Sequence, residues 1–306
     1  MALTVDKTNT TDASSLFETG KLNVTVLTVK AGNEASLPPK PVLIASPTDA
    51  GMYPVVLFVH GFFCQNKYYT QLLRHISSHG FIIVAPQLFT ILPQSPTEDI
   101  KSVADVTNWL PIGLQSLLPT DVKPDFEKLA LSGHSRGGHT SFSLALGHAQ
   151  TTLKFTALIG IDPVAGTSKS SQLKPEILTD ESKLDIPAMV IGSGLGEESI
   201  NFMTPACAPK GVNHKEFYNK CSTPCYHFVV TKYGHMDMLD DNAFNLMTKC
   251  MCKNGKCRDI MRRCTAGITV AFLKAYTQKE AEYLDLIWSK PGLAPGELEP
   301  VDCCKE

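Results

Sequence analysis

The sequence predicts a single α/β domain whose central sheet is mainly parallel and carries helices on both faces. Short apolar runs rich in β-branched residues, such as 55–59 (VVLFV) and 81–85 (FIIVA), recur along the chain. Continuous runs of this kind are typical of strands buried on both faces. Longer amphipathic stretches separate them, and strands that alternate with helices form parallel sheets covered on both sides.

The predicted elements follow one another in a regular order. Residues 22–29 (LNVTVLTV) and 41–45 (PVLIA) predict a leading hairpin, which suits an antiparallel edge of the sheet. The central strands are expected at 55–59, 81–85, 129–131, 157–161, 188–191 and 226–231. Apolar residues at helical spacing predict helices over 68–78, 99–118 (interrupted or kinked at Pro111), 136–147, 240–250 and 259–276.

Composition and charge indicate a globular protein. The chain has 306 residues, of which 43% are hydrophobic and 19% charged, so it can bury a sizeable core. The formal net charge is −2 and no block of like charge stands out, which argues against nucleic acid as the main partner. No apolar run approaches the roughly 18 residues needed to cross a bilayer. We expect one domain over residues 19–306.

The first 18 residues are expected to form a polar, disordered tail. They have no positively charged segment followed by an apolar one, so they do not resemble a secretory signal. Asp6, Asp12 and Glu18, with no arginine before Arg74, also make a poor transit peptide. The residues alone therefore do not indicate a compartment.

Ten cysteines are many for such a chain, and six of them lie between Cys207 and Cys257. A zinc site would prefer paired C-x2-C knuckles or matched histidines, and the spacing offers neither. No metal is therefore expected. Reduced thiols, or one or two local disulfides near the C-terminal end, fit the pattern better.

A serine stands between glycines where one predicted strand ends, in residues 129–138 (LALSGHSRGG). Glycine and serine are common in ordinary turns. The same pattern is typical of a nucleophile elbow, which holds a catalytic serine clear of the sheet. The pattern alone does not separate the two interpretations, so the other strand ends have to decide.

Polar residues follow the neighbouring strands at the edge where sites of parallel sheets gather. Asp162 follows strand 157–161 and His235 follows strand 226–231, so serine, acid and histidine occur in the chain order of the α/β-hydrolase triad. In such a triad the imidazole takes the serine proton and the carboxylate orients the imidazole. We therefore expect an α/β-hydrolase fold with Ser135 as nucleophile, His235 as base and Asp162 as acid.

The acid has competitors. Many hydrolases place it one strand later, which here would be Glu197 or Glu198. Asp162 is preferred because its strand is the stronger pattern and because Pro163 fixes the backbone directly after it. An ordinary turn aspartate before proline is the alternative for Asp162.

The base has competitors as well. His227 lies inside a predicted strand and His214 in an irregular polar stretch, whereas His235 follows a glycine at a strand end. A loop there can reach back over the sheet, so His235 is preferred. His134, beside Ser135, is expected to pack against a neighbouring loop and not to act in catalysis.

An acyl-transfer site also needs donors for the developing oxyanion. The backbone amide of Arg136, directly after Ser135, is one candidate. The other is expected from the loop after strand 55–59, where Gly61 lets the backbone come close and the amide of Phe62 follows.

Several long stretches resemble plant chlorophyllases: YPVVLFVHGF, HISSHGFIIVAPQL, SGHSRGG, ALIGIDPVAGT and YGHMDMLDD, together with CMCKNGKCR and AGITVAFLKAY. The similarity runs from about Lys40 to Tyr276. It implies hydrolysis of the ester that joins phytol to chlorophyll, and it places the family's triad on Ser135, Asp162 and His235. It implies no cofactor, because the magnesium belongs to the substrate. It also implies a chloroplast location, with the cytosol or the surface of an internal membrane as alternatives.

Apolar side chains near the predicted site suit an apolar substrate. Phe63, Phe89, Ile91, Leu92 and Trp109 could line a pocket for phytol or the macrocycle, and ordinary core packing is the alternative. Peripheral contact with a membrane is compatible with such a substrate. Two other functions stay open: a carboxylesterase or lipase acting on another lipid-like ester, and a hydrolase fold that binds ligands without catalysis.

Overall fold

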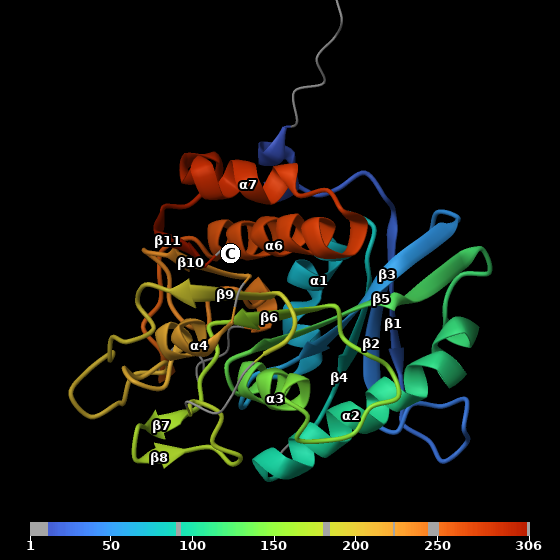
Figure 1. Ribbon diagram of the computed structural model, residues 1–306, viewed down its shortest axis with the longest axis horizontal. Coiled ribbons are helices and arrows are strands. Elements are labelled where there is room, and N and C mark those ends of the chain that lie inside the picture. Colours follow the sequence, from blue (N-terminus) through green and yellow to red (C-terminus); the bar gives the residue numbers. More distant parts are fainter. Residues whose placement is uncertain (1–11, 90–92, 180–183, 223, 244–250, 305–306) are drawn as a thin grey trace, which may run out of the picture.

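The computed structural model describes residues 12–89, 93–179, 184–222, 224–243 and 251–304. Within these residues, nine strands form one sheet in the order β1-β2-β4-β3-β5-β6-β9-β10-β11 (Figure 1). Their bounds are β1 Val24–Val29, β2 Val42–Pro47, β3 Gly51–Val59, β4 Ile82–Pro86, β5 Val122–His134, β6 Ala157–Ile161, β9 Ala188–Ser193, β10 Cys225–Val230 and β11 Leu298–Cys304. A separate short hairpin consists of β7 Gly166–Ser168 and β8 Ser171–Gln172.

The predicted mainly parallel sheet is confirmed. Strands β4, β3, β5, β6, β9 and β10 pair in parallel, and the leading pair β1 and β2 is antiparallel, as expected. The register keeps the carboxyl ends of the central strands level, because Val59 of β3 lies opposite Gly133 of β5, which lies opposite Gly160 of β6. Residues that follow these strands therefore meet at one edge.

Helices cover both faces of the sheet (Figure 1). Their bounds are α1 Thr70–Ser77, α2 Pro96–Gly113, α3 Arg136–Ala145, α4 His214–Lys220, α6 Arg258–Leu273 and α7 Glu282–Ser289. Short turns are η1 Ala13–Phe17, η2 Asn66–Tyr69, η3 Leu114–Leu117, η4 Asp241–Ala243, the π-helical η5 Lys274–Gln278 and η6 Pro291–Leu293. Side chains from α1 and α6 build one hydrophobic core, and side chains from α2, α3 and α4 build the other.

The strands alternate between the two cores, as the pleat requires. On β3, Val55 and Leu57 belong to the core under α2 and α3, whereas Val56 and Phe58 belong to the core under α1 and α6. All four side chains are at most 2% exposed. Burial of each stabilises the fold by about 1.5–3 kcal/mol. Because the strand is buried on both faces, its apolar run is continuous, and the sequence predicts the strand from that run.

Helix α2 begins earlier and ends earlier than the sequence predicts. Ser95 caps its first turn, and Glu98 completes the capping box by accepting a hydrogen bond from the Ser95 amide. The helix contains Pro111 and ends at Gly113, after which the chain tightens into η3. Pro111 has no amide to donate to the Thr107 carbonyl, so the last turns of α2 lack one hydrogen bond, although the helix runs through Pro111 to Gly113.

Residues 12–18 belong to the folded domain. Asp12 caps η1. Leu16 and Phe17 of η1 are buried, and Phe17 packs against Gly267 of α6. A tail that extends to residue 18 therefore does not describe residues 12–18, because two apolar side chains anchor this segment. Residues 1–11 lie outside the described part of the chain.

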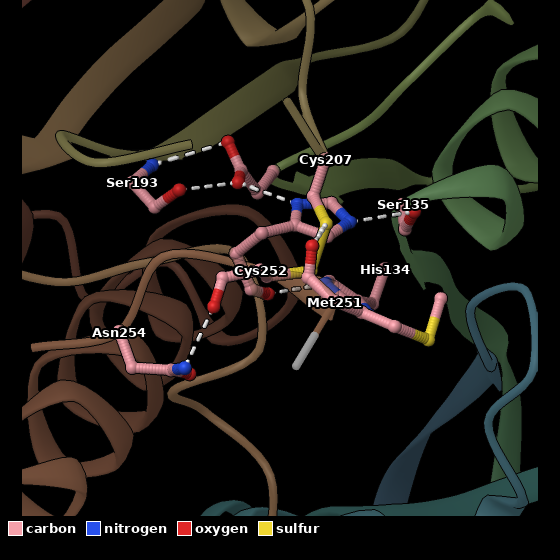
Figure 2. Close-up of a disulfide and its surroundings, with 9 residues drawn as sticks. His134, Ser135, Ser193, Cys207, Met251, Cys252 and Asn254 are labelled. Atoms are coloured by element: carbon pink, nitrogen blue, oxygen red, sulfur yellow. Dashed lines mark hydrogen bonds and ion pairs between the residues drawn. A yellow bond between two sulfur atoms is a disulfide. The ribbon is translucent and has the colours of Figure 1, made fainter. Parts of the chain in front are cut away.

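The C-terminal region differs most from the prediction. The pattern did not indicate α7 or β11, and β11 pairs antiparallel with β10 at the edge of the sheet. Of the helix expected over 240–250, the described part is the turn η4, and residues 244–250 lie outside the described chain. The disulfide in Figure 2 joins Cys207 to Cys252 across 45 residues, so the expectation of local disulfides is wrong for this bond.

The described residues contain neither a membrane-spanning helix nor a cluster suited to a metal ion. Helices in the described ranges are too short or too polar to cross a bilayer. Likewise, the described side chains contain no group of three or more histidine, cysteine, aspartate or glutamate residues arranged to hold a metal ion.

Candidate active site

Ser135 lies on the sharp turn between β5 and α3. Its backbone angles, φ 56° and ψ −125°, lie outside the regions that residues other than glycine ordinarily occupy, so the backbone is strained here. Two glycines make the turn possible. A Cβ atom at Gly133 would collide with the carbonyl oxygen of Gly137, and one at Gly137 would collide with that of Val59. The turn has the strand–turn–helix geometry of a nucleophile elbow.

Three side chains from different strand ends meet at this turn. The Nε2 atom of His235 lies 2.8 Å from Ser135 Oγ, and its Nδ1 atom lies 2.7 Å from Asp162 Oδ2. The hydrogen bond that reaches Ser135 is drawn in Figure 2. Ser135 is 8% exposed, His235 4% and Asp162 0%. The imidazole can therefore accept the serine proton at Nε2 while its Nδ1–H donates to a buried carboxylate.

Asp162 is held by a residue that the sequence did not single out. The Ser193 amide donates to Asp162 Oδ1 over 3.1 Å, and the Ser193 hydroxyl donates to Oδ2 (Figure 2). Burial by itself would raise the pKa of Asp162, but the hydrogen bond and charge of His235 and the Ser193 hydroxyl lower this pKa to about 2. The group is therefore a carboxylate at neutral pH. A signal existed, because Ser193 ends a strand at the same edge as Asp162.

The alternative acids have other partners. Glu197 accepts hydrogen bonds from Asn213 Nδ2 at 2.8 Å and from Lys215 Nζ at 2.9 Å. Glu198 lies 3.8 Å from Lys253 Nζ. The structure thus brings Asp162 to His235 and turns Glu197 and Glu198 toward cations elsewhere.

The loop after β3 lies directly against Ser135. A Cβ atom at Gly61 would come within 3.1 Å of Ser135 Cβ, so this approach requires glycine. The next amide, of Phe62, and the first amide of α3, of Arg136, are therefore both close to the serine. The first amides of a helix have no partner within the helix and carry partial positive charge, which favours an anion.

Comparison with known proteins decides the family. The family model for chlorophyllase matches residues 12–305. The chain is 44% identical to "Chlorophyllase-2" of Arabidopsis thaliana, over 93% of this chain and 95% of the relative. It is 47% identical to "Chlorophyllase-1" of the same plant, over 93% and 91%. It is 45% identical to "Chlorophyllase-1, chloroplastic" of Citrus unshiu, over 94% and 88%.

The chain belongs to the chlorophyllase family. The mainly parallel sheet with helices on both faces agrees with an α/β-hydrolase fold. The resemblance seen in the sequence is thereby confirmed over nearly the whole chain.

In this chlorophyllase-family chain, three aromatic side chains form an apolar ledge beside Arg136, the residue that follows Ser135. Phe62 is 37% and Phe63 43% exposed, and their ring centroids are 4.1 Å apart. Phe89 packs edge-on against Phe62 with centroids 6.4 Å apart. The Arg136 guanidinium lies 5.4 Å from the Phe62 ring and pairs with Asp99 on α2, so it links the ledge to helix α2.

Trp109, another predicted substrate-lining residue, lies elsewhere. Trp109 is 4% exposed, packs in the core under α2, and donates its indole N–H to the Ser36 carbonyl. Ordinary core packing is thus the interpretation that describes Trp109. Ile91 and Leu92 lie outside the described residues.

The other histidines near the predicted site, His134, His214 and His227, have structural partners. His134 is fully buried and contacts Tyr69 and the His235 backbone, which agrees with the expected packing role. His214 is the first residue of α4 and not part of an irregular stretch. Its Nδ1 atom lies 2.8 Å from Nε2 of His227 in β10.

The disulfide braces the loop that carries His235. Cys252 is joined to Cys207, which follows β9 in the chain. Three residues after Cys252, the Gly255 amide donates to Asp237 Oδ2 over 2.6 Å, and the Gly234 amide donates to the same oxygen. Segment 251–257 therefore supports the turn on both sides of His235.

Proposed function

We propose that this protein is a serine esterase that hydrolyses the phytyl ester of chlorophyll to chlorophyllide and phytol. The observation that carries the proposal is the hydrogen-bonded series from Ser135 Oγ through His235 to Asp162. It lies in a chain of the chlorophyllase family, whose curated relatives bear the name of this activity.

The first half-reaction forms an acyl-enzyme. Ser135 Oγ attacks the ester carbonyl carbon of the propionate arm while His235 Nε2 takes the hydroxyl proton. The amides of Phe62 and Arg136 donate to the oxyanion of the tetrahedral intermediate. When the intermediate collapses, the bond to the phytyl oxygen breaks, and His235 returns the proton to that oxygen, so phytol leaves.

The second half-reaction releases chlorophyllide. Water enters, gives its proton to His235 Nε2 and attacks the acyl carbon. Collapse of the second intermediate frees Ser135 Oγ, which recovers the proton. Throughout, the Asp162 carboxylate holds the Nδ1–H of His235 and stabilises the imidazolium. The low pKa of Asp162, about 2, keeps this carboxylate ionised at physiological pH.

The ledge of Phe62, Phe63 and Phe89 supports an apolar substrate. The exposed rings of Phe62 and Phe63, beside buried Phe89, lose contact with water when they pack against a phytyl chain or a macrocycle. A short acyl ester would cover little of this surface. The ledge therefore favours chlorophyll over a small carboxylic ester.

Product analysis tests the proposal. Purified protein is incubated with chlorophyll and, separately, with a short-chain nitrophenyl ester, and chlorophyllide and phytol are quantified by chromatography. We expect chlorophyllide formation, with kcat/KM on chlorophyll well above that on the short ester. Ser135→Ala should leave at most the residual catalysis of binding and oxyanion donors, roughly 10³–10⁴ over water.

The reverse preference would assign a carboxylesterase or lipase function instead. Inactivity of the folded wild-type protein on both esters would favour a binding protein.

We further infer that the protein works in the chloroplast against a lipid surface. Relatives from two Citrus species are named chloroplastic. Phe202 and Met203, in the loop after β9, are 95% and 77% exposed, and Phe62 and Phe63 follow β3 at the same edge of the sheet. Such side chains suit peripheral insertion. Flotation with thylakoid-lipid vesicles should be lost in Phe202→Ser/Met203→Ser, and imaging of a fluorescent fusion would test the compartment.

A further inference from the structure

Three loops of the candidate site are joined by one buried hydrogen-bonded chain. The Gly61 amide lies 3.1 Å from Tyr69 Oη, Tyr69 Oη lies 2.7 Å from His134 Nδ1, and His134 Nε2 lies 2.9 Å from the His235 carbonyl oxygen. Gly61 precedes the oxyanion donor Phe62, His134 precedes the nucleophile, and His235 is the base. Tyr69 and His134 are both 0% exposed.

The direction of every bond in this chain is determined. A carbonyl oxygen only accepts, so His134 Nε2 carries the proton and donates to His235. A neutral imidazole then has a free lone pair at Nδ1, which must accept from the Tyr69 hydroxyl. The Tyr69 oxygen is left to accept from the Gly61 amide. The chain therefore runs in one direction, from the loop after β3 to the loop after β10.

Both ionisable members keep the protonation state that the chain needs. Burial, together with the nearby His235, lowers the pKa of His134 to about 3, so the ring stays neutral. Burial, with the Cys64 thiol beside it, raises the pKa of Tyr69 well above 10, so the hydroxyl keeps its proton. Neither group can leave the chain by titration near neutral pH.

Packing reinforces the same three contacts. A Cβ atom at Gly61 would lie 2.8 Å from His134 Nδ1, and the rings of His134 and His235 are 4.7 Å apart. The turn that carries Tyr69 also holds the far end of the base loop, since the Asp240 amide donates to the Tyr68 carbonyl over 2.7 Å. Little freedom is left to the loop of Phe62 relative to the loop of His235.

We propose that Tyr69 and His134 are positioning residues, which hold the oxyanion donor of Phe62 and the base His235 in register with Ser135. This inference rests on the proposed esterase function. It assigns a role to the histidine of the GHSRG turn and to a tyrosine outside every sequence motif. Neither residue touches the reacting atoms in this account, and both act through the backbone of the groups that do.

The test removes one link at a time. Tyr69→Phe deletes the hydroxyl and keeps the ring, and we expect kcat on chlorophyll to fall roughly 10- to 100-fold with little change in KM, because a misplacement near 1 Å costs about this much. The melting temperature should change no more than in Tyr226→Phe. That matched control loses a buried hydroxyl of β10, which lies 3.5 Å from the Tyr276 hydroxyl, and it should keep wild-type kcat.

A second set of variants separates positioning from general stability. His134→Gln keeps an amide donor that can reach the His235 carbonyl, so it should retain more activity than His134→Ala. Binding of a long-chain trifluoromethyl ketone, whose adduct with Ser135 uses the oxyanion donors, should weaken in Tyr69→Phe about as much as kcat falls. Binding of the matching unreactive ether should stay unchanged. If Tyr69→Phe does not fold, the His134 variants give the answer alone.

A double-variant cycle gives the sharpest result. Because the links form one chain, Tyr69→Phe/His134→Gln should lose no more activity than the worse single variant. The inference would be overturned if folded Tyr69→Phe and His134→Gln both kept kcat within twofold of wild type. It would also be overturned if Tyr69→Phe bound the ketone and the ether more weakly by the same factor. Ser135→Ala tells the two proposals apart. Wild-type turnover in that variant would refute the esterase mechanism and this inference with it, whereas lost turnover in Ser135→Ala beside unaffected Tyr69 and His134 variants would refute the inference alone.

Discussion

Two pairs of buried histidines have very different partners. The site pair, His134 and His235, has ring centroids 4.7 Å apart, and the second pair, His214 and His227, has centroids 5.1 Å apart. All four residues are at most 4% exposed. Yet His235 lies between a serine hydroxyl and a carboxylate, whereas Nε2 of His227 contacts the other histidine of its pair.

The difference comes from position along one strand. His227 lies inside β10 and His235 in the loop that follows it. A residue inside the strand has its ring fixed by neighbouring strands and helices, here with Tyr218 stacked on it at 4.9 Å. A residue past the strand end can be turned by its loop toward the elbow of β5. Burial and clustering of histidines therefore do not define a site, and the loop position does.

Replacing the base gives the largest expected effect. His235→Gln should lower kcat on chlorophyll by roughly 10⁴ to 10⁶, because among the described residues it is His235 Nε2 that lies within hydrogen-bond distance of Ser135 Oγ. His227→Gln should stay within a few-fold of wild type. Steady-state assays of both purified variants check this. Comparable losses in the two would break the distinction between the pairs.

The acid comes next. Asp162→Asn should lower kcat by about 10⁴, because an amide stabilises the wrong tautomer of His235 and cannot balance an imidazolium. Glu197→Gln is the matched control and should be nearly silent, since its carboxylate pairs with Asn213 and Lys215. The same chlorophyll assay measures both. If Asp162→Asn kept wild-type kcat, the role of triad acid would belong to another residue.

The support of the acid gives a smaller effect. Ser193→Ala removes one of the hydrogen bonds to the Asp162 carboxylate, and we expect kcat to fall on the order of tenfold, since bonds to charged groups contribute about 1.5–3 kcal/mol. Ser141→Ala removes a buried hydroxyl that donates to the Ser132 carbonyl and serves as control. Equal losses in the two variants would mean that the effect is packing and not support of the acid.

The smallest effect concerns stability against acid. Burial lowers the pKa of His227 from 6.5 to about 3. Between pH 3 and pH 6.5, therefore, His227 binds a proton in the unfolded chain but not in the folded chain. The free energy of unfolding therefore falls as pH falls through this window, by about 1.4 kcal/mol per pH unit for this group. His227→Gln should flatten the pH dependence in urea unfolding. An unchanged slope would mean that His227 can be protonated in the folded state.

The strands and their ends could be predicted from sequence because local patterns encode them. VVLFV, FIIVA and ALIGI are buried on both faces, so nothing polar interrupts them. The serine, acid and histidine each follow such a run, and level strand ends bring them together. The site was thus predictable to the extent that it depends on strand ends.

What the sequence did not indicate depends on contacts between distant residues. Phe17 is buried by Gly267, and no local pattern shows that two residues 250 positions apart will meet. The edge strand β11 contains Pro300 and is largely exposed, so it lacks an apolar run. Tyr69 acquires its partners through the fold alone, and Ser193 ends a strand at the right edge but reaches Asp162 because β6 and β9 lie side by side. For Trp109 the sequence leaves a substrate pocket and the core as alternatives, because an apolar helix face has the same pattern whether it faces a core or a ligand.

The most direct test of the central claim is active-site labelling read out together with turnover. The protein is titrated with a fluorophosphonate, the adduct is located by peptide mass spectrometry, and residual chlorophyll hydrolysis is measured at each step. We predict one adduct on Ser135, with activity lost in proportion to its occupancy. Full labelling of Ser135 with chlorophyll hydrolysis intact would contradict the account.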